Sequence, residues 1–259
     1  MNTTPDRTPI PVSVVLITRN EEHHIEACLE SLRDFPEVIV VDNGSVDETI
    51  SLAKAFSNAK VISSEWKGYG PTRQVGVDAA QHDWVFWIDA DERMSTELVN
   101  EIRESLATAE THCVFTLPRM NYFLGQHIRG CGWSPDRVTR LFHRAHSRFD
   151  EKIVHEGLAG NTQRKVIPLK NPLEHYSYRN VKQFFEKNLR YAMLAADERK
   201  RLQRKVSAFS LVLRPFWEFF NSFILKRGFL DGLRGFVISA GAAAYVFYRD
   251  SLVYFDRSE

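Results

Sequence analysis

Short apolar runs alternate with helical segments in the N-terminal part of the chain, and this alternation restricts the possible fold more than any other feature. Runs rich in β-branched and aromatic residues predict buried strands at Val12–Thr18, Val38–Asp42, Lys60–Ser64 and Trp84–Ile88. Apolar residues at helical spacing predict helices between these strands, over 25–32, 50–56 and 72–80. Strands and helices that alternate in this way are typical of a mostly parallel sheet with helices on both faces. The predicted fold class is therefore α/β.

Polar residues stand where the predicted strands end. Thr18 closes the first strand, Asp42 the second and Asp89 follows the fourth. In open parallel sheets, ligands bind beyond the carboxyl ends of the strands. We therefore expect these three segments to deliver polar groups to one crevice. Ser45 and Glu48, just after the second strand, have the spacing of a capping box and predict the start of the next helix.

The composition excludes several classes of protein. The chain has 259 residues, and its 34 Lys and Arg against 33 Asp and Glu leave no overall field that favours nucleic acid. Its three cysteines lack metal-ligand spacing, so a reducing compartment fits best. The N-terminus has no signal layout, and we expect the catalytic part to stay in the cytoplasm. No apolar run approaches the roughly 20 residues of a membrane span, since Phe236–Tyr248 is bounded by Arg234 and Arg249.

Asp89-Ala90-Asp91-Glu92 follows directly after an apolar strand. Divalent cations bind to oxygen ligands of this kind, and a cation held there can neutralise charge on a departing phosphate group. The alternative is a solvated acidic turn before a helix, which is the commoner meaning of so short a motif. The motif therefore needs support from the rest of the chain.

That support comes from a resemblance to a known family. The segments Ser13–Glu22, Val38–Thr49 and Trp84–Glu92 resemble glycosyltransferase family 2, whose nucleotide-sugar-binding domain has the GT-A fold. Further segments resemble the branch of β-1,4-glucosyltransferases that act on the inner core of bacterial lipopolysaccharide: Val85–Glu92, Val154–Glu156, Glu174–Tyr178 and Arg227–Gly232. The resemblance extends over nearly the whole chain. It implies inverting transfer of a sugar, with UDP-glucose favoured as donor, to that core or a similar lipid-linked saccharide, with Mg²⁺ or Mn²⁺ as cofactor.

The resemblance also implies roles for residues of the donor site. Asp42 would bind the nucleotide base, and Thr18 and Glu21 would line the base and ribose pocket. Asp89 would contact the ribose or the metal, and Asp91 would be the principal metal ligand. The alternatives are local: Asp42 can form a turn, and Thr18 and Glu21 can serve the start of a helix. Many family members have two acids where this chain has Asp42-Asn43.

Four further residues are candidates at the edge of this site. Arg73 follows a Gly-rich basic loop and is a candidate donor contact, with a solvated surface arginine as the alternative. His175 is a candidate third metal ligand, although a histidine among aromatic residues is more often structural. Arg137 and Arg140 are candidates for binding anionic acceptor groups, and the alternative for both is a charged strand edge.

Inversion requires a base that removes the proton of the acceptor hydroxyl. Glu156 is the candidate base, and His155 would orient it or bind acceptor phosphate. Asp150 and Glu151 compete with Glu156 for this role, because the sequence contains no distances.

The expected domain organisation has two parts. Residues 12–178 form the GT-A domain, with a donor half at 12–110 and an acceptor half at 111–178, and residues 179–259 form a helical extension. The extension mixes aromatic residues with cations, which is typical of a membrane interface. We therefore expect the enzyme to be peripheral on the inner face of the bacterial inner membrane. The alternative is a helical appendage packed on the catalytic domain or on another subunit.

Other functions remain open from the sequence. A nucleotidyltransferase also combines a parallel sheet with an acidic metal site, but it would carry a Gly-rich phosphate loop, which Thr18–Glu21 is not. The enzyme can transfer another hexose or a heptose to a different cell-envelope glycan. A non-catalytic sugar-binding module of the same fold is the third alternative.

Overall fold

The computed structural model describes residues 9–149, 158–160 and 164–256. The chain divides into two compact units, and each is described by itself. Unit 1 consists of Met1–Arg119 and Arg137–His175, and unit 2 consists of Met120–Asp136 and Tyr176–Glu259. Residues 120–136 therefore group with the C-terminal helices. The functional boundaries expected near residues 110 and 178 stay a prediction.

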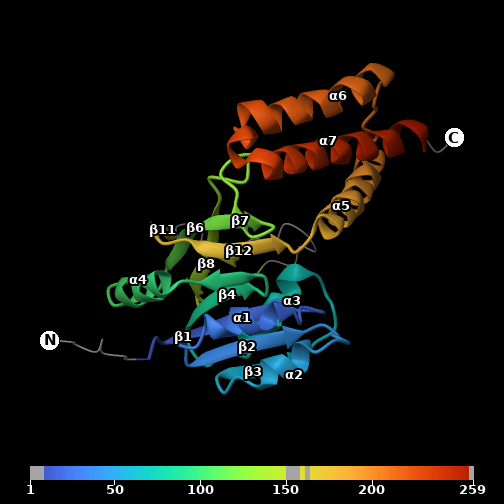
Figure 1. The fold of residues 1–259 in the computed structure, drawn as a ribbon. Helices are drawn as coiled ribbons and strands as arrows, with labels where there is room; N and C mark the ends of the chain where they lie inside the picture. The colour runs from blue at the N-terminus through green and yellow to red at the C-terminus, as the bar shows by residue number, and fades with distance from the viewer. Residues whose placement is uncertain (1–8, 150–157, 161–163, 257–259) are drawn as a thin grey trace. The chain divides into compact units, whose positions relative to one another are not determined.

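The parallel part of the sheet lies in unit 1 and has the strand order β3-β2-β1-β4 (Figure 1). Its strands are β1 (Val12–Thr18), β2 (Glu37–Asp42), β3 (Ala59–Ser63) and β4 (Trp84–Asp89). β1 lies between β2 and β4 and is parallel to both. All six residues of β2 are buried, as expected for a strand covered on both faces. The four predicted strands are confirmed.

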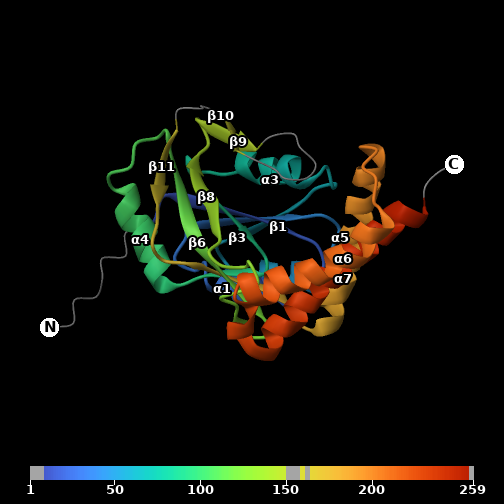
Figure 2. The same cartoon turned by 90° about the horizontal axis from the view of Figure 1, so that it is seen from above.

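Helices cover both faces of this parallel part. Alternate residues of β1 face opposite sides: Val14 and Leu16 pack with α1 (Ile25–Glu30), whereas Val15 packs with α3 (Tyr69–Asp78) (Figure 2). The face of α1 is also covered by α2 (Thr49–Lys54) and α4 (Thr96–Leu106). Within α3, a Cβ added at Gly76 would lie 2.4 Å from Val15 Cγ1, so only glycine allows α3 this close to β1.

The sheet continues beyond β4 with antiparallel strands. The order is β4-β8-β6-β12-β5, and two more strands pair with β6: β7 is antiparallel to it, whereas β11 is parallel to it. Their bounds are β5 (Glu92–Met94), β6 (Cys113–Phe123), β7 (Gln126–His127), β8 (Arg137–His143), β11 (Lys165–Pro168) and β12 (Leu173–Tyr178). A separate two-stranded sheet pairs β9 (Ser147–Phe149) with β10 (Leu158–Gly160). The predicted strands at 113–118 and 138–143 are confirmed, and the first extends further than expected.

Unit 2 contains the C-terminal helices α5 (Val181–Arg201), α6 (Ala208–Phe220) and α7 (Gly232–Phe255). Asn180 caps α5 by accepting a hydrogen bond from Gln183 N at 2.8 Å. Ser207 and Ser210 form a capping box at the start of α6. A π-helical turn over 221–225 and a 3₁₀ turn over 228–231 connect α6 to α7. The predicted helical extension is confirmed.

One C-terminal helical segment changes the expectation about membrane spans. Gly228–Phe255 has 28 residues, and its most apolar stretch of 18 residues has a mean hydropathy of 1.2, so by length and composition the segment is apolar enough to cross a membrane. The apolar run between Arg234 and Arg249 is shorter, but α7 continues through both arginines. The uninterrupted apolar run is therefore as short as expected from the sequence, whereas the helix that contains it is long enough for a membrane span. A core helix of a water-soluble protein can have the same length and apolar composition.

Candidate functional site

The ends of β1, β2 and β4 meet at one edge of the sheet. Thr18 is in register with Asp42, and Ile17 is in register with Asp89. The prediction that these strand ends lie together is confirmed. Thr18 is buried, and its hydroxyl has no hydrogen-bond partner among the described residues.

Asp42 organises the turn after β2. Its buried carboxylate accepts hydrogen bonds from Gly44 N at 2.9 Å and Ser45 N at 3.1 Å, and from the Ser45 hydroxyl. The turn-forming alternative for Asp42 therefore describes its local geometry. The capping box predicted for Ser45 and Glu48 is wrong, because Asp42 engages the Ser45 hydroxyl and α2 begins at Thr49 with no side-chain cap.

Hydrogen bonds join this turn to the loop after β1. Asn20 has a positive φ of 56°, its N–H donates to Ser45 Oγ at 2.9 Å, and its side-chain oxygen accepts from Val46 N at 2.9 Å. The N–H of Glu21 donates to Thr49 Oγ1 at 2.8 Å. These bonds hold the backbone of Glu21 beside the turn that Asp42 forms.

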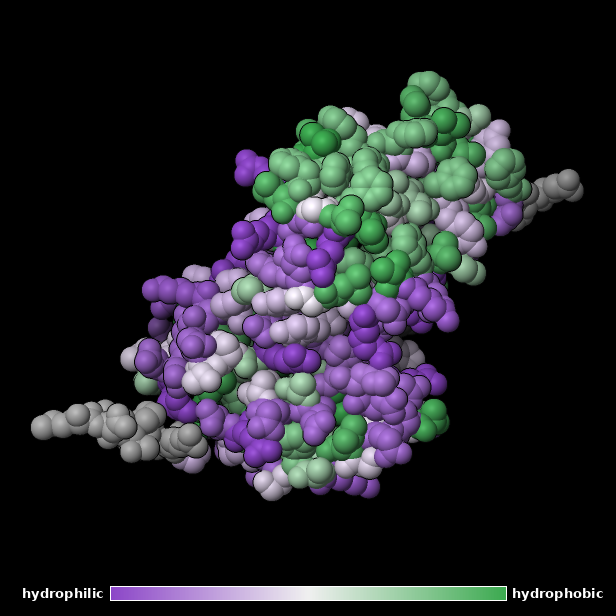
Figure 3. Space-filling model, in the orientation of Figure 1, coloured by the Kyte–Doolittle hydropathy of each residue, from purple (hydrophilic) through white to green (hydrophobic). Residues whose placement is uncertain are grey.

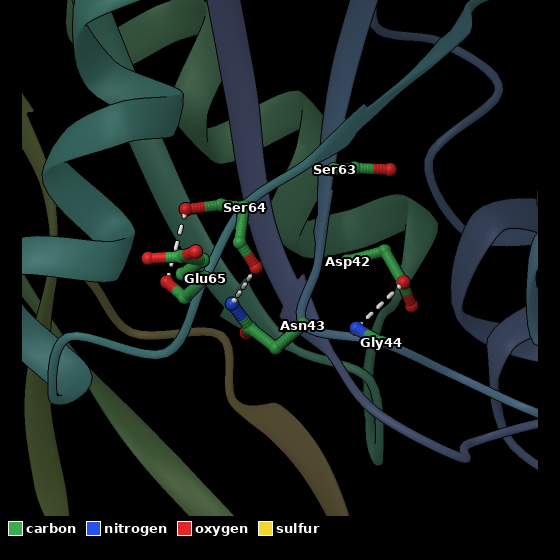
Figure 4. Close-up of a pocket in the computed structure, with 6 residues that line it drawn as sticks. All are labelled: Asp42, Asn43, Gly44, Ser63, Ser64 and Glu65. Atoms are coloured by element: carbon green, nitrogen blue, oxygen red, sulfur yellow. Dashed lines mark hydrogen bonds between the residues drawn. The ribbon is translucent and has the colours of Figure 1, made fainter.

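A pocket of about 430 Å³ opens beside Asp42 at the ends of β2 and β3 (Figure 4). Its lining residues are Asp42, Asn43, Gly44, Ser63, Ser64 and Glu65. The Asn43 side-chain amide donates to Ser64 O at 3.1 Å, and Ser64 N donates to Asp42 O at 2.9 Å. The contribution of 63–65 cannot be predicted from the sequence, since nothing in the pattern of β3 marks its end as part of a site.

Two arginines form hydrogen-bonded ion pairs with the carboxylate of Asp89. Arg73 Nη2 donates to Oδ1 at 2.6 Å, and Arg140 Nη2 donates to Oδ2 at 3.1 Å. Burial favours the neutral acid, but the two guanidinium groups outweigh it and hold the pKa of Asp89 well below its usual range. Arg73, expected at the donor, and Arg140, expected at the acceptor, therefore lie together.

Glu92 lies behind Asp89 and is completely buried. Its carboxylate accepts hydrogen bonds from Arg140 and, at 3.0 Å, from the backbone N–H of Asp89, and Arg119 Nη1 lies 3.5 Å away. Burial raises the pKa of Glu92, and the charge of Arg140 opposes this effect. In the sequence Glu92 is only a third acid of the motif, and nothing there shows that its carboxylate positions Arg140 and the backbone of Asp89.

The ring of Trp87, on β4, contacts the same two arginines. The guanidinium carbons of Arg73 and Arg140 lie 4.0 Å and 3.5 Å from its ring centroid. Cation–π contacts of this kind hold a guanidinium group in place and leave its edge available for hydrogen bonds. From the sequence, Trp87 is predicted only as part of a strand.

Asp91, the second acid of the motif, lies beside His175 of β12. Asp91 Oδ2 lies 3.4 Å from His175 Nε2, and both side chains remain partly exposed. The imidazole of His24 is also near, since the charge of Asp91 acts on it, although burial lowers the pKa of His24 overall. No group of three or more potential ligands occurs among His, Cys, Asp and Glu of the described residues. Two protein donors suit an open site of the kind that diphosphate oxygens and water complete.

The remaining predicted site residues have different surroundings. Arg137 donates to two backbone carbonyls, Thr116 O at 3.1 Å and Leu169 O at 2.9 Å. The Nη1 and Nε groups of Arg140 are buried and have no hydrogen-bond partner among the described residues. Glu156 and His155 lie outside the residues that the structure describes, as do their competitors at 150 and 151.

Comparison with known proteins identifies the family. Residues 13–162 match the family Glycosyl transferase family 2, which is more than half of the chain. The chain therefore belongs to glycosyltransferase family 2, and its fold is the GT-A fold with a helical C-terminal extension. The resemblance noted in the sequence is confirmed.

Two curated relatives match over most of the chain. The lipopolysaccharide core biosynthesis glycosyltransferase LpsC of Rhizobium meliloti is 27% identical over 260 residues, which cover 95% of this chain and 92% of LpsC. An uncharacterized glycosyltransferase of Rickettsia typhi is 30% identical over 238 residues, which cover 88% of this chain and 81% of the relative.

Two solved structures are also similar. TarS of S. aureus (residues 1–349) is 19% identical with a TM-score of 0.47, and the match covers 93% of this chain and 90% of TarS. Glucosyl-3-phosphoglycerate synthase from Mycobacterium tuberculosis, solved with Mn²⁺, UDP and phosphoglyceric acid, is 30% identical with a TM-score of 0.36. That match covers 42% of this chain and 43% of the synthase.

Proposed function

We propose that this glycosyltransferase moves glucose from UDP-glucose, with inversion, to the inner core of lipopolysaccharide or a similar lipid-linked saccharide. The observation that carries the proposal is the cluster at the end of β4, where Asp89 is held by Arg73 and Arg140 and Asp91 lies beside His175. Family membership supports sugar transfer, and the relative LpsC supports the acceptor class. Another hexose or a heptose would use the same residues.

The donor would lie along the joined ends of β1, β2 and β4. The pocket beside Asp42 has the size and polar lining to take a nucleoside, and the free hydroxyl of Thr18 and the nearby Glu21 would complete it. Asp89 would contact the ribose. Arg73 and Arg140 would meet the diphosphate, because Arg140 keeps two buried N–H groups without a partner among the described residues.

Asp91 and His175 would hold the divalent cation. A carboxylate oxygen and an imidazole nitrogen suit Mn²⁺, and Mg²⁺ is compatible with the carboxylate. When bound, the ion supplies a Lewis acid that neutralises the negative charge of the departing diphosphate. Both oxygens of Asp89 accept hydrogen bonds from arginines, so Asp91 is the preferred metal ligand. A metal role for Asp89 stays a prediction.

On the acceptor side, Glu156 is the proposed base. It would take the proton of the attacking hydroxyl while the diphosphate leaves from the opposite face of the sugar. His155 and Arg137 are proposed to bind anionic groups of the acceptor, whereas Arg140 is assigned to the donor diphosphate because it lies with Arg73 on Asp89. A carboxylate is a sufficient base here because the hydroxyl becomes more acidic as the new bond forms.

A transfer assay tests the proposed function. Full-length protein is incubated with UDP-[¹⁴C]glucose, Mn²⁺ and core-truncated lipopolysaccharide dispersed in detergent, and label in the lipid fraction is counted. We expect labelled lipopolysaccharide whose new linkage is β by NMR. Release of free glucose without any labelled acceptor would contradict the proposal, and so would an α linkage.

The proposed location is the inner face of the inner membrane, where a lipid-linked acceptor is present. The support is the aromatic and cationic composition of the C-terminal helices and the apolar segment Gly228–Phe255.

A further inference from the structure

The outer face of α6 carries a stripe of exposed apolar side chains. Phe209, Leu213, Phe216 and Phe220 recur at helical spacing, and the stripe continues to Ile224 in the π-helical turn. Phe209 is 75% exposed and Phe216 is 71% exposed. The apolar face of α6 therefore points to solvent, whereas a surface helix usually buries its apolar face.

This apolar surface extends around the turn between α6 and α7. Leu225, Phe229, Leu230 and Leu233 are all exposed, Leu233 by 84%. Of the 24 exposed large hydrophobic side chains among the described residues, 14 lie between Phe209 and Phe255. Figure 3 shows this hydrophobic surface gathered over α6 and α7. A patch of this extent marks an interaction site.

Two cations stand within the apolar turn. Lys226 and Arg227 are exposed between Leu225 and Phe229, and neither forms an ion pair with a carboxylate of the described residues. Asp231 is the one acid of this turn and offsets only one of the two positive charges; its carboxylate accepts hydrogen bonds from the backbone N–H groups of Arg129 at 2.9 Å and Gly130 at 2.8 Å. The charge of this turn is therefore positive.

A second positive cluster lies between α5, α6 and α7. The completely buried carboxylate of Asp250 is shared by three guanidinium groups, with Arg249 at 2.7 Å, Arg214 at 3.3 Å and Arg199 at 3.5 Å. One negative charge cannot balance three positive charges. Arg214 belongs to α6 and is 46% exposed. Between residues 206 and 230 the only acidic residue is Glu218.

We propose that the α6 stripe and the turn at 224–233, here called the docking face, lie in the interface of a bilayer rich in anionic phospholipid. The rings and Leu side chains enter the boundary between headgroups and acyl chains, and Lys226 and Arg227 bind lipid phosphates. Charge complementarity favours lipid over a second copy of the chain, since lysine is depleted in the core of protein interfaces and two like surfaces would repel. The inference deepens the proposed membrane location and identifies the residues and lipid class that produce it.

Vesicle flotation tests this inference with the full chain. Vesicles of phosphatidylcholine alone are compared with vesicles that contain phosphatidylglycerol, at low and high salt. Each basic residue near an anionic surface contributes about 1 kcal/mol, so Lys226→Glu/Arg227→Glu should weaken binding to the anionic vesicles by at least ~25-fold. Phe209→Ser/Phe216→Ser should weaken binding to a similar degree at high salt, where the apolar contribution dominates.

Matched controls separate this face from general effects of charge and hydrophobicity. Lys54→Glu/Lys60→Glu makes the same change in net charge on exposed residues of unit 1, and Val46→Ser removes a side chain that is 91% exposed there. Both controls should bind anionic vesicles as the wild type does. Equal losses in the controls would overturn the proposal, as would absence of binding to anionic vesicles.

Two further results would assign the face to another occupant. A dimer in solution that Phe209→Ser/Phe216→Ser dissociates would make the docking face a contact between copies of the chain. Resistance of the membrane-bound protein to alkaline carbonate would show a spanning segment in place of a peripheral face. Transfer to the detergent-dispersed acceptor is measured separately, so failure of vesicle binding and failure of the proposed transfer are distinguishable.

Discussion

Asp91 Oδ2 and His175 Nε2 lie only 3.4 Å apart, although Asp91 belongs to the turn between β4 and β5 and His175 belongs to strand β12. Antiparallel pairing of β5 with β12 places Glu92 in register with His175 and so brings the two side chains together. A carboxylate and an imidazole at this distance, both partly exposed, can share one cation.

The first prediction concerns this pair. Asp91→Asn should lower kcat/KM by about 100-fold or more, because a lost metal contact removes roughly 2.7 kcal/mol or more of charge stabilisation. His175→Ala should have a smaller effect in the same direction. The measurement is steady-state transfer over a range of Mn²⁺ concentrations. Asp83→Asn, an exposed acid outside the cluster, is the control, and near-normal activity of Asp91→Asn would exclude it as a ligand.

Glu156→Gln should keep donor binding and abolish turnover, because the amide cannot accept the acceptor proton. UDP-glucose affinity by calorimetry and transfer by the radiolabel assay give the two readouts. Asp150→Asn and Glu151→Gln are matched comparisons. If Glu156→Gln turns over near the wild-type rate while one of the other two does not, the base lies at that other position.

The buried pair of Arg140 and Glu92 supports a prediction about stability. Arg140→Leu should lower the free energy of unfolding by about 3–5 kcal/mol, since it removes the main partner of a completely buried carboxylate. The double variant Arg140→Leu/Glu92→Leu should recover most of this loss, because no buried charge remains uncompensated at position 92. Urea unfolding measures the free energy of unfolding of both variants. A double variant that is less stable than Arg140→Leu, as additive losses would make it, would contradict this description of the pair.

Asp89 predicts a dependence of stability on pH. Its folded-state pKa is lowered by Arg73 and Arg140, so the stabilisation is present above the unfolded pKa of about 3.9 and is lost as pH falls through the folded value. The stability difference between the wild type and Asp89→Asn should therefore be constant from about pH 5 to 7 and shrink below about pH 4. A difference that grows on acidification would contradict the assignment of the cause.

The sequence predicts the parallel part of the fold well because its signals are local. The runs that become β1, β2 and β4 are apolar on both faces, and the helices between them keep a 3.6-residue period. The short strand β5 and helix α4 were missed. The strand β5 has only three residues, which are too few to show an alternation of apolar and polar residues. Helix α4, in contrast, has a signal in the sequence: its N-cap is Ser95, whose hydroxyl accepts a hydrogen bond from Leu98 N at 3.2 Å.

The candidate site is predicted only in part, since the rest depends on distances. Thr18, Asp42 and Asp89 follow from the rule that strand ends meet. Nothing in the sequence shows that Arg140, on β8, reaches back to Asp89, because that contact depends on the antiparallel pairing of β8 with β4. Ser45 was assigned to a cap because spacing alone cannot show that Asp42 engages its hydroxyl first.

Calorimetric titration of nucleoside diphosphate sugars with and without Mn²⁺ tests the central claim most directly. We predict that UDP-glucose binds, that Mn²⁺ strengthens its binding by at least about tenfold, and that Asp91→Asn removes this increase while retaining metal-independent binding. Failure of every nucleoside diphosphate sugar to bind, in the presence or absence of Mn²⁺, would contradict the claim that the ends of β1, β2 and β4 form a donor site.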